Sequence, residues 1–107
     1  MSEEKARLSC AALVVEAICR DFEGRERALE RGSVKRRVQM EYHYLNAKIF
    51  EGVAEITGTA PARAFIKEIG SGIGYSHSEV SWMAESTYKR YKRRAIENIA
   101  RKLHYLN

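Results

Sequence analysis

The sequence predicts an all-α fold, a single compact domain of four to five helices. Apolar residues recur along most of the chain at spacings of three and four, which is the period of one buried helix face. The strict alternation that marks half-buried strands is absent, and Pro61 is the one proline in the sequence. With 107 residues the chain has room for one hydrophobic core, which excludes large barrels, multidomain enzymes and long repeat arrays.

The first helix is predicted over residues 1–24, with Gly24 as its stop. Its apolar residues form one stripe: Leu8, Ala11, Ala12, Val15, Ile18, Cys19 and Phe22. Residues 25–33 are highly charged and have no apolar stripe beyond Ala28 and Leu29. We therefore expect this stretch to be a charged linker or a frayed helix.

A long amphipathic helix is predicted over residues 34–57, with Ser33 as its N-cap. Its apolar positions step by three and four: Val34, Val38, Tyr42, Leu45, Ile49, Val53 and Ile56. Thr57 and Gly58 should end it, since glycine adopts the left-handed conformation found after many helices. The stripe can be buried within the monomer or against a second copy of the chain, and the sequence leaves both open.

Two further helices joined by a tight turn are predicted over residues 60–84. Thr59 can cap the first, Pro61 is tolerated in its first turn, and its inner face is formed by Ala62, Phe65, Ile66, Ile69 and Ile73. Ser76 and Glu79 have the spacing of a capping box, which predicts a new helix at that point. That helix either runs to the C-terminus or breaks once near Glu85–Ser86, leaving residues 85–107 as a basic C-terminal helix.

The segment from Ile66 to Met83 resembles the helix-turn-helix family of bacterial and phage regulators. Gly70 stands where the two helices touch, a position that is usually alanine in the family, and Gly74 and Tyr75 follow at the turn. The resemblance implies that the second helix enters the major groove of double-stranded DNA. The residues it would carry there are Ser76, His77, Ser78, Ser81 and Trp82.

The formal net charge of +5 is concentrated in two blocks, +4 over residues 25–39 and +5 over residues 85–107. The second block contains five closely spaced cations that would contact DNA phosphates: Lys89, Arg90, Lys92, Arg93 and Arg94. Such contacts supply affinity rather than sequence choice. A basic run of this kind is also compatible with a solvated helix face that binds nothing.

The function that these observations predict is a DNA-binding transcriptional regulator of phage or mobile-element type, with a homodimer expected if it reads a two-fold site. Two features favour an alternative. Residues 60–84 are electrically neutral, and Trp82 occupies a position where a reader of bases would carry a polar side chain. The alternative is a protein–protein interaction module, or a phage-encoded inhibitor, that uses the same shape and Trp82 to bind another protein.

Catalysis has no candidate residues, because neither cysteine has a base on its helix face and no Ser/His/Asp set is recognisable. His43, His77 and His104 are far apart in sequence without carboxylates or thiols at ligand spacing, so no metal site is expected. The glycines at 70–74 follow no readable strand, which argues against a nucleotide loop. The sequence therefore predicts a non-enzymatic protein without a cofactor.

Cys10 and Cys19 are nine positions apart, which places them on opposite faces of a helix. We expect no disulfide between them and place both as small core or semi-buried residues. No apolar run approaches the roughly 20 residues of a membrane span. The acidic start lacks a basic region ahead of the apolar run 11–17, so a cytoplasmic protein without a signal peptide is expected.

Overall fold

The computed structural model describes residues 3–72, 75, 78, 80 and 82–106, with side chains from Cys10 onward. This part of the chain is all-α, as predicted, with no strand. It contains five helices, which are α1 (Glu3–Arg20), α2 (Phe22–Arg31), α3 (Arg36–Thr57), α4 (Ala62–Ser71) and α5 (Glu85–Lys102).

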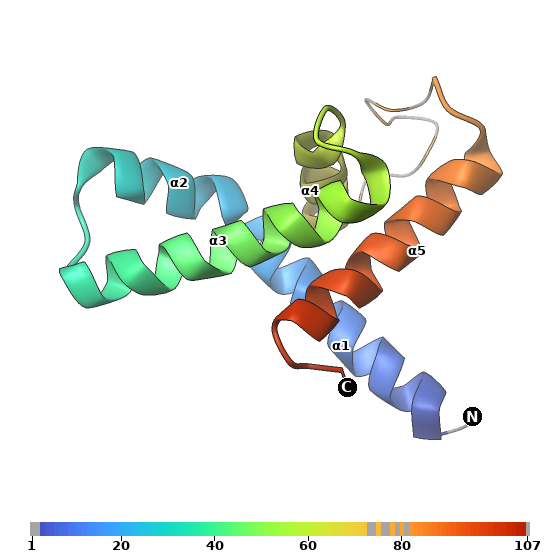
Figure 1. The fold of residues 1–107 in the computed structure, drawn as a ribbon, viewed down its shortest axis with the longest axis horizontal. Coiled ribbons are helices and arrows are strands. Elements are labelled where there is room, and N and C mark those ends of the chain that lie inside the picture. The colour runs from blue at the N-terminus through green and yellow to red at the C-terminus, as the bar shows by residue number, and fades with distance from the viewer. Residues whose placement is uncertain (1–2, 73–74, 76–77, 79, 81, 107) are drawn as a thin grey trace.

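The helices form a flat assembly with extents of 41 × 35 × 21 Å, in which α3 runs along the long axis (Figure 1). α3 packs most extensively against α5, and α1 packs against both α4 and α5, while α2 folds back along α3. The largest side chains at the centre come from four helices: Phe65, Ile49, Ile66, Ile69, Ile99, Val15 and Val53. Burial of this apolar surface, worth about 1.5–3 kcal/mol for each large side chain, holds the helices together.

Residues 25–31 are helical, so the linker interpretation is wrong. They belong to α2, and Gly24, the expected helix stop, lies inside this helix. The reason is a buried cation, since Arg25 is 8% exposed and its Nε donates a 2.6 Å hydrogen bond to Asn46 Oδ1 on α3. A second guanidinium nitrogen donates to the carbonyl oxygen of Ile18 on α1, and Asn46 Nδ2 donates to the carbonyl oxygen of Phe22. The charged composition of this stretch conceals an arginine that joins three helices.

The two helices predicted next are present. α3 follows Lys35 rather than Ser33 and ends before Gly58, whose φ of 87° lies in the left-handed region. The centre of its apolar stripe, Ile49 and Val53, is fully buried within the monomer. α4 begins after Pro61 and ends before Gly72. The φ of Gly72 is 72°, which also lies in the left-handed region.

The predicted helix-turn-helix unit is not confirmed. After α4, the described residues Ser78, Val80 and Trp82–Ala84 lie outside any helix, and α5 begins at Glu85. Ser76 and Glu79, the two ends of the predicted capping box, lie outside the described residues. Local side-chain bonds stabilise the non-helical path, because Ser78 Oγ accepts a 2.9 Å hydrogen bond from the Val80 N–H and the Tyr75 hydroxyl donates to the Met83 carbonyl oxygen.

Gly70 is a point of close helix approach, but its neighbour is α1 rather than a recognition helix. A Cβ atom added to Gly70 would lie 2.6 Å from the backbone nitrogen of Arg20, a separation that real Cβ atoms do not tolerate. The Arg20 side chain also donates a 3.2 Å hydrogen bond from Nε to the Gly70 carbonyl oxygen. The residue that the sequence placed at the contact between the two helices of a DNA-binding unit therefore fixes the crossing of α1 and α4.

Candidate functional site

Two of the five residues predicted to contact bases are described by the structure. Ser78 is 8% exposed, and its hydroxyl oxygen is occupied by the Val80 N–H. Trp82 is 73% exposed, three residues before the start of α5. Ser76, His77 and Ser81 lie outside the described residues. A buried Ser78 hydroxyl has little surface to offer a base edge, so Trp82 is the accessible member of the pair.

The basic block 89–94 forms the first half of α5, and the structure separates its cations by direction. Successive residues on an α-helix turn by about 100°, which places Arg90 and Arg94 on the same outward face. Both are exposed, as are Lys89 and Arg93, whereas Lys92 is half-buried. Arg101 is exposed on the same outward face two turns further on. The sequence prediction omitted Arg101, although its spacing of seven from Arg94 is a helical repeat that could have revealed it.

The outward arginines have no acidic partner among the described residues, since of the five cations in 89–94 only Lys89 has a carboxylate within reach. Lys89 Nζ lies 3.2 Å from Glu85 Oε1. Arg90 lies 5.7 Å from the centre of the Tyr91 ring, and Lys92 Nζ lies 5.9 Å from the centre of the Tyr88 ring. Among the residues that the structure describes, the other four cations, on about one and a half turns, form no ion pair.

The last turn of α5 is different, because its lysine is neutralised by α3. Lys102 Nζ lies 2.7 Å from Glu55 Oε2, and this contact raises the pKa of Lys102 and lowers the pKa of Glu55. Asn98 Nδ2 donates to the Gly52 carbonyl oxygen at 3.0 Å. These contacts fix the rotation of α5 on α3.

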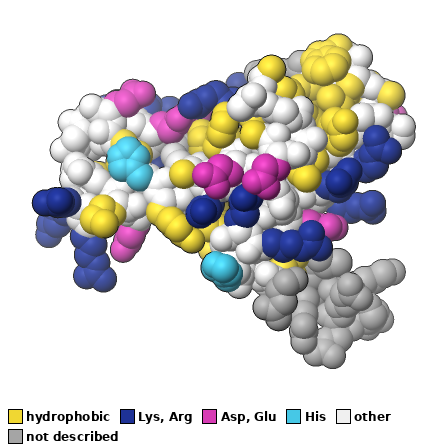
Figure 2. Space-filling model, viewed as in Figure 1, with side chains coloured by type: hydrophobic (Ala, Val, Ile, Leu, Met, Phe, Trp, Pro, Cys, Tyr) yellow, Lys and Arg dark blue, Asp and Glu magenta, His cyan; other side chains and the backbone are white. Residues whose placement is uncertain are grey.

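A second basic cluster lies at the corner between α2 and α3, at the opposite end of the long axis from the first half of α5 (Figure 1). Figure 2 shows dark blue side chains at this corner, at the left of the view, and again over α5 at the right. The corner cluster is formed by exposed side chains: Arg31, Lys35, Arg36 and Arg37. Arg25 belongs to the same block in the sequence but is buried, which lowers its pKa.

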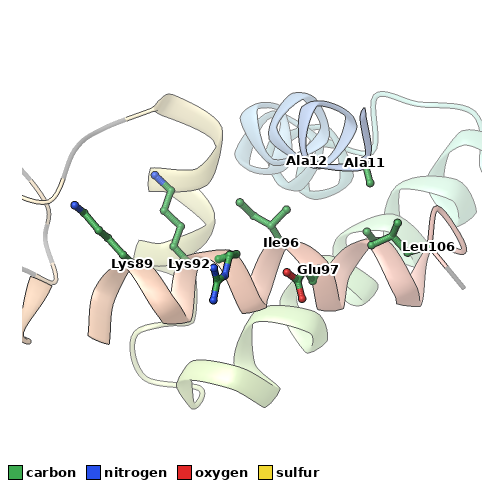
Figure 3. Close-up of a pocket in the computed structure, with 9 residues that line it drawn as sticks. Ala11, Ala12, Lys89, Lys92, Ile96, Glu97 and Leu106 are labelled. Carbon is green, nitrogen blue, oxygen red and sulfur yellow. The ribbon is translucent and has the colours of Figure 1, made fainter. Parts of the chain in front are cut away.

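A groove of about 360 Å³ separates α1 from α5 (Figure 3). Its floor is apolar and is formed by Ala11, Ala12, Ile96 and Ala100, with Leu106 at one end. The side chains of Lys89, Lys92 and Arg93 line the other end, and Glu97 completes the lining. No local sequence pattern indicates this groove, because it is formed by segments about eighty residues apart.

Cys10 and Cys19 are both free thiols, as predicted, but Cys10 is exposed rather than part of the core. Cys19 is 3% exposed, and burial raises the pKa of its thiol to about 12. The residues that the structure describes include no group of three His, Cys, Asp or Glu side chains able to hold a metal ion. None of the helices in the described ranges combines the length and the apolar character needed to cross a membrane.

Comparison of this chain with protein-family models, with curated proteins and with solved structures finds no match.

Proposed function

We propose that this protein is a small DNA-binding regulator that contacts the phosphates of duplex DNA through α5. The single observation that supports this proposal is the exposed arginine face of α5, formed by Arg90, Arg94 and Arg101, with Arg93 and Lys89 beside it. Guanidinium groups bind phosphate oxygens with two parallel hydrogen bonds, and they remain charged at any physiological pH. Among the described residues, none of these arginines forms an ion pair with a carboxylate that would compete with phosphate, although Glu97 lies on the same helix one turn from Arg93, Arg94 and Arg101.

The dimensions of this face suit a duplex. Arg90 and Arg101 are eleven residues apart, which is about 16 Å along the helix axis. The major groove is about 12 Å wide and accepts an α-helix, and its two walls carry the phosphates. Base contacts remain a prediction from the sequence for five residues: Ser76, His77, Ser78, Ser81 and Trp82. Because Ser78 is buried, the proposal rests mainly on contacts between α5 and the DNA phosphates.

A pair of charge-matched variants tests the proposal. Arg90→Gln, Arg94→Gln and Arg101→Gln together remove three charges from α5, and Arg31→Gln, Arg36→Gln and Arg37→Gln remove three from the α2–α3 corner. We expect the α5 variant to bind duplex weakly, with a slope of log affinity against log salt that is shallower by about 2.7. The corner variant should keep most of the native slope. Equal losses in both variants would show that the net charge alone attracts DNA and would refute the proposal.

A second candidate function is an interaction module that binds another protein, and the exposure of Trp82 favours it. Tryptophan is the residue type most enriched at energetic centres of protein interfaces, and a 73% exposed side chain is available for one. Under this alternative, Trp82→Ala should abolish a protein complex and leave DNA binding unchanged. Loss of DNA binding in the same variant would place Trp82 at the DNA interface instead.

A further inference from the structure

The groove between α1 and α5 has an apolar floor because its walls are built from small side chains. Ala11 and Ala12 on α1 and Ala100 on α5 all line the groove, so the two helices leave space that larger residues would fill. Ile96 reaches toward the two alanines from α5 in Figure 3. The volume of about 360 Å³ lies within the range of roughly 300–1,000 Å³ that is usual for small-molecule sites.

The positively charged side chains of the groove lie at one of its ends. Lys89, Lys92 and Arg93 belong to the first half of α5, whereas Leu106 lies at the opposite end, beyond Ile96 (Figure 3). Glu97 is the one acidic residue of the lining, and in Figure 3 its carboxylate points away from the two alanines of α1. The apolar space between α1 and α5 is therefore open to a hydrocarbon chain, with cations at one end of it.

We propose that this groove binds a small anionic amphiphile, a single carboxylate on an unbranched alkyl chain. The carboxylate would lie between Lys89 and Arg93, where lysine and arginine form charge-assisted hydrogen bonds to carboxylate oxygens. It would compete there with Glu85, whose Oε1 lies 3.2 Å from Lys89 Nζ. The alkyl chain would extend over Ala12 and Ile96 toward Leu106, where burial contributes about 0.8 kcal/mol per methylene group. This inference does not rest on DNA binding, because it depends on the groove, but it shares Lys89 and Arg93 with the proposed DNA-binding face.

The charge pattern favours such a ligand over a helix from a partner protein. An amphipathic helix is about 10 Å across with its side chains and carries polar groups along its whole length. A complementary groove would have polar rims along both edges, whereas here the cations lie at one end only. A second copy of this chain would likewise have to place an acidic group beside Lys89 and Arg93 and an apolar surface along the rest of the groove.

Two ligands and three variants test the inference on the full chain. Decanoate has the proposed chemistry, and decanol has the same chain without the charge. Binding is measured by calorimetry below the concentration at which decanoate forms micelles, and by NMR shifts of the methyl groups of Ala11, Ala12 and Ala100. We expect decanoate to shift these methyl groups and to bind about tenfold more tightly than decanol, which corresponds to about 1.4 kcal/mol.

Lys89→Gln with Arg93→Gln should remove the preference for decanoate, leaving both ligands at the affinity of decanol. Arg90→Gln with Arg94→Gln is the matched control, because it removes the same charge from the same helix outside the groove and should preserve the preference. Ala12→Phe should fill the groove and abolish binding of both ligands. The paired glutamine variants alter exposed side chains, so they decide the question even if Ala12→Phe does not fold.

Equal binding of decanoate and decanol to the native chain would overturn the inference, and so would an unchanged preference after Lys89→Gln with Arg93→Gln. Sedimentation of the unliganded protein tests whether a second copy of the chain occupies the groove. A dimer that Ala12→Phe dissociates would assign the groove to a second copy and would also overturn it. The same conclusion would follow if an acidic amphipathic peptide, but not decanoate, shifted the alanine methyl groups.

Discussion

The hydroxyl group of Tyr88 on α5 donates a 2.7 Å hydrogen bond to Glu68 Oε1 on α4, and both side chains are at most 2% exposed. The other carboxylate oxygen of Glu68 is buried and has no hydrogen-bond partner within the described part of the chain. The Tyr88 ring also stacks on Phe65, with 5.6 Å between the ring centres. A polar contact thus joins α4 and α5 in the interior of the protein.

Replacing Tyr88 with phenylalanine should destabilise the protein by about 1–3 kcal/mol, because Glu68 would keep its burial and lose its donor. The ring contact with Phe65 would survive, so the loss reports on the hydrogen bonds of the Tyr88 hydroxyl, which involve Glu68 and the Ser78 side chain. Glu68→Gln keeps an acceptor for Tyr88 and should cost less. The measurement is the free energy of unfolding in urea for both single variants and the double variant, and a phenylalanine variant as stable as the native chain would contradict the prediction.

Replacing Gly70 with alanine should destabilise the protein by about 1–3 kcal/mol, because the new methyl group would overlap the α1 backbone at Arg20. Gly24 provides the control. It lies inside α2 with nothing within 4 Å of an added Cβ, so Gly24→Ala should stabilise the helix by up to about 1 kcal/mol. Thermal unfolding of the two variants should move the midpoint in opposite directions. A shift of the same sign would show that Gly70 is not a close-approach position.

Replacing Arg25 with lysine should also destabilise the chain, even though the charge is preserved. Arg25 uses two separate nitrogens to bond Asn46 and the Ile18 carbonyl, and a single ammonium group cannot reproduce that fork. The expected cost is about 1–3 kcal/mol. Arg27, an exposed arginine of the same helix, is the matched control, and Arg27→Lys should be neutral in urea unfolding. If neither Arg25→Lys nor Arg27→Lys changed the free energy of unfolding, Arg25 would not join the helices.

The stability of the native state should fall when the pH rises from about 9 toward 12. Burial raises the pKa of the Cys19 thiol from 9.0 to about 12. Burial and the bond to Glu68 raise the pKa of Tyr88 from 10.0 to about 12. Both groups are neutral when protonated, and the folded chain holds the proton more tightly than the unfolded chain does. The contribution of these two groups to the free energy of unfolding is therefore complete below their pKa values in the unfolded chain. It is lost as the pH rises toward their pKa values in the folded chain.

Urea unfolding at a series of pH values measures this loss, and Cys19→Ala should reduce it. Cys10→Ala is the matched control, because Cys10 is exposed and its removal should leave the pH dependence unchanged. A stability that stays constant up to pH 12 would contradict the prediction for both buried groups.

The all-α class and the positions of α3 and α4 could be predicted from the sequence alone. The sequence also indicated α1, although this helix ends at Arg20 and the expected stop, Gly24, lies inside α2. These predictions depend on local signals, which are the three- and four-residue spacing of apolar side chains and the glycines that follow α3 and α4. Gly58 and Gly72 both have the positive φ that such positions require. Local spacing also predicted that Cys10 and Cys19 would not be bridged.

The features that depend on residues distant in the sequence could be assigned only from the folded chain. Arg25 is helical and buried because Asn46, twenty-one residues away, accepts its hydrogen bond. Gly70 is small because α1 crosses it at Arg20, fifty residues earlier. The direction of each cation on α5 follows from how Asn98 and Lys102 attach that helix to α3. Sequence patterns report the period of a helix, whereas the rotation of that helix and its neighbours is set by long-range packing and hydrogen bonds.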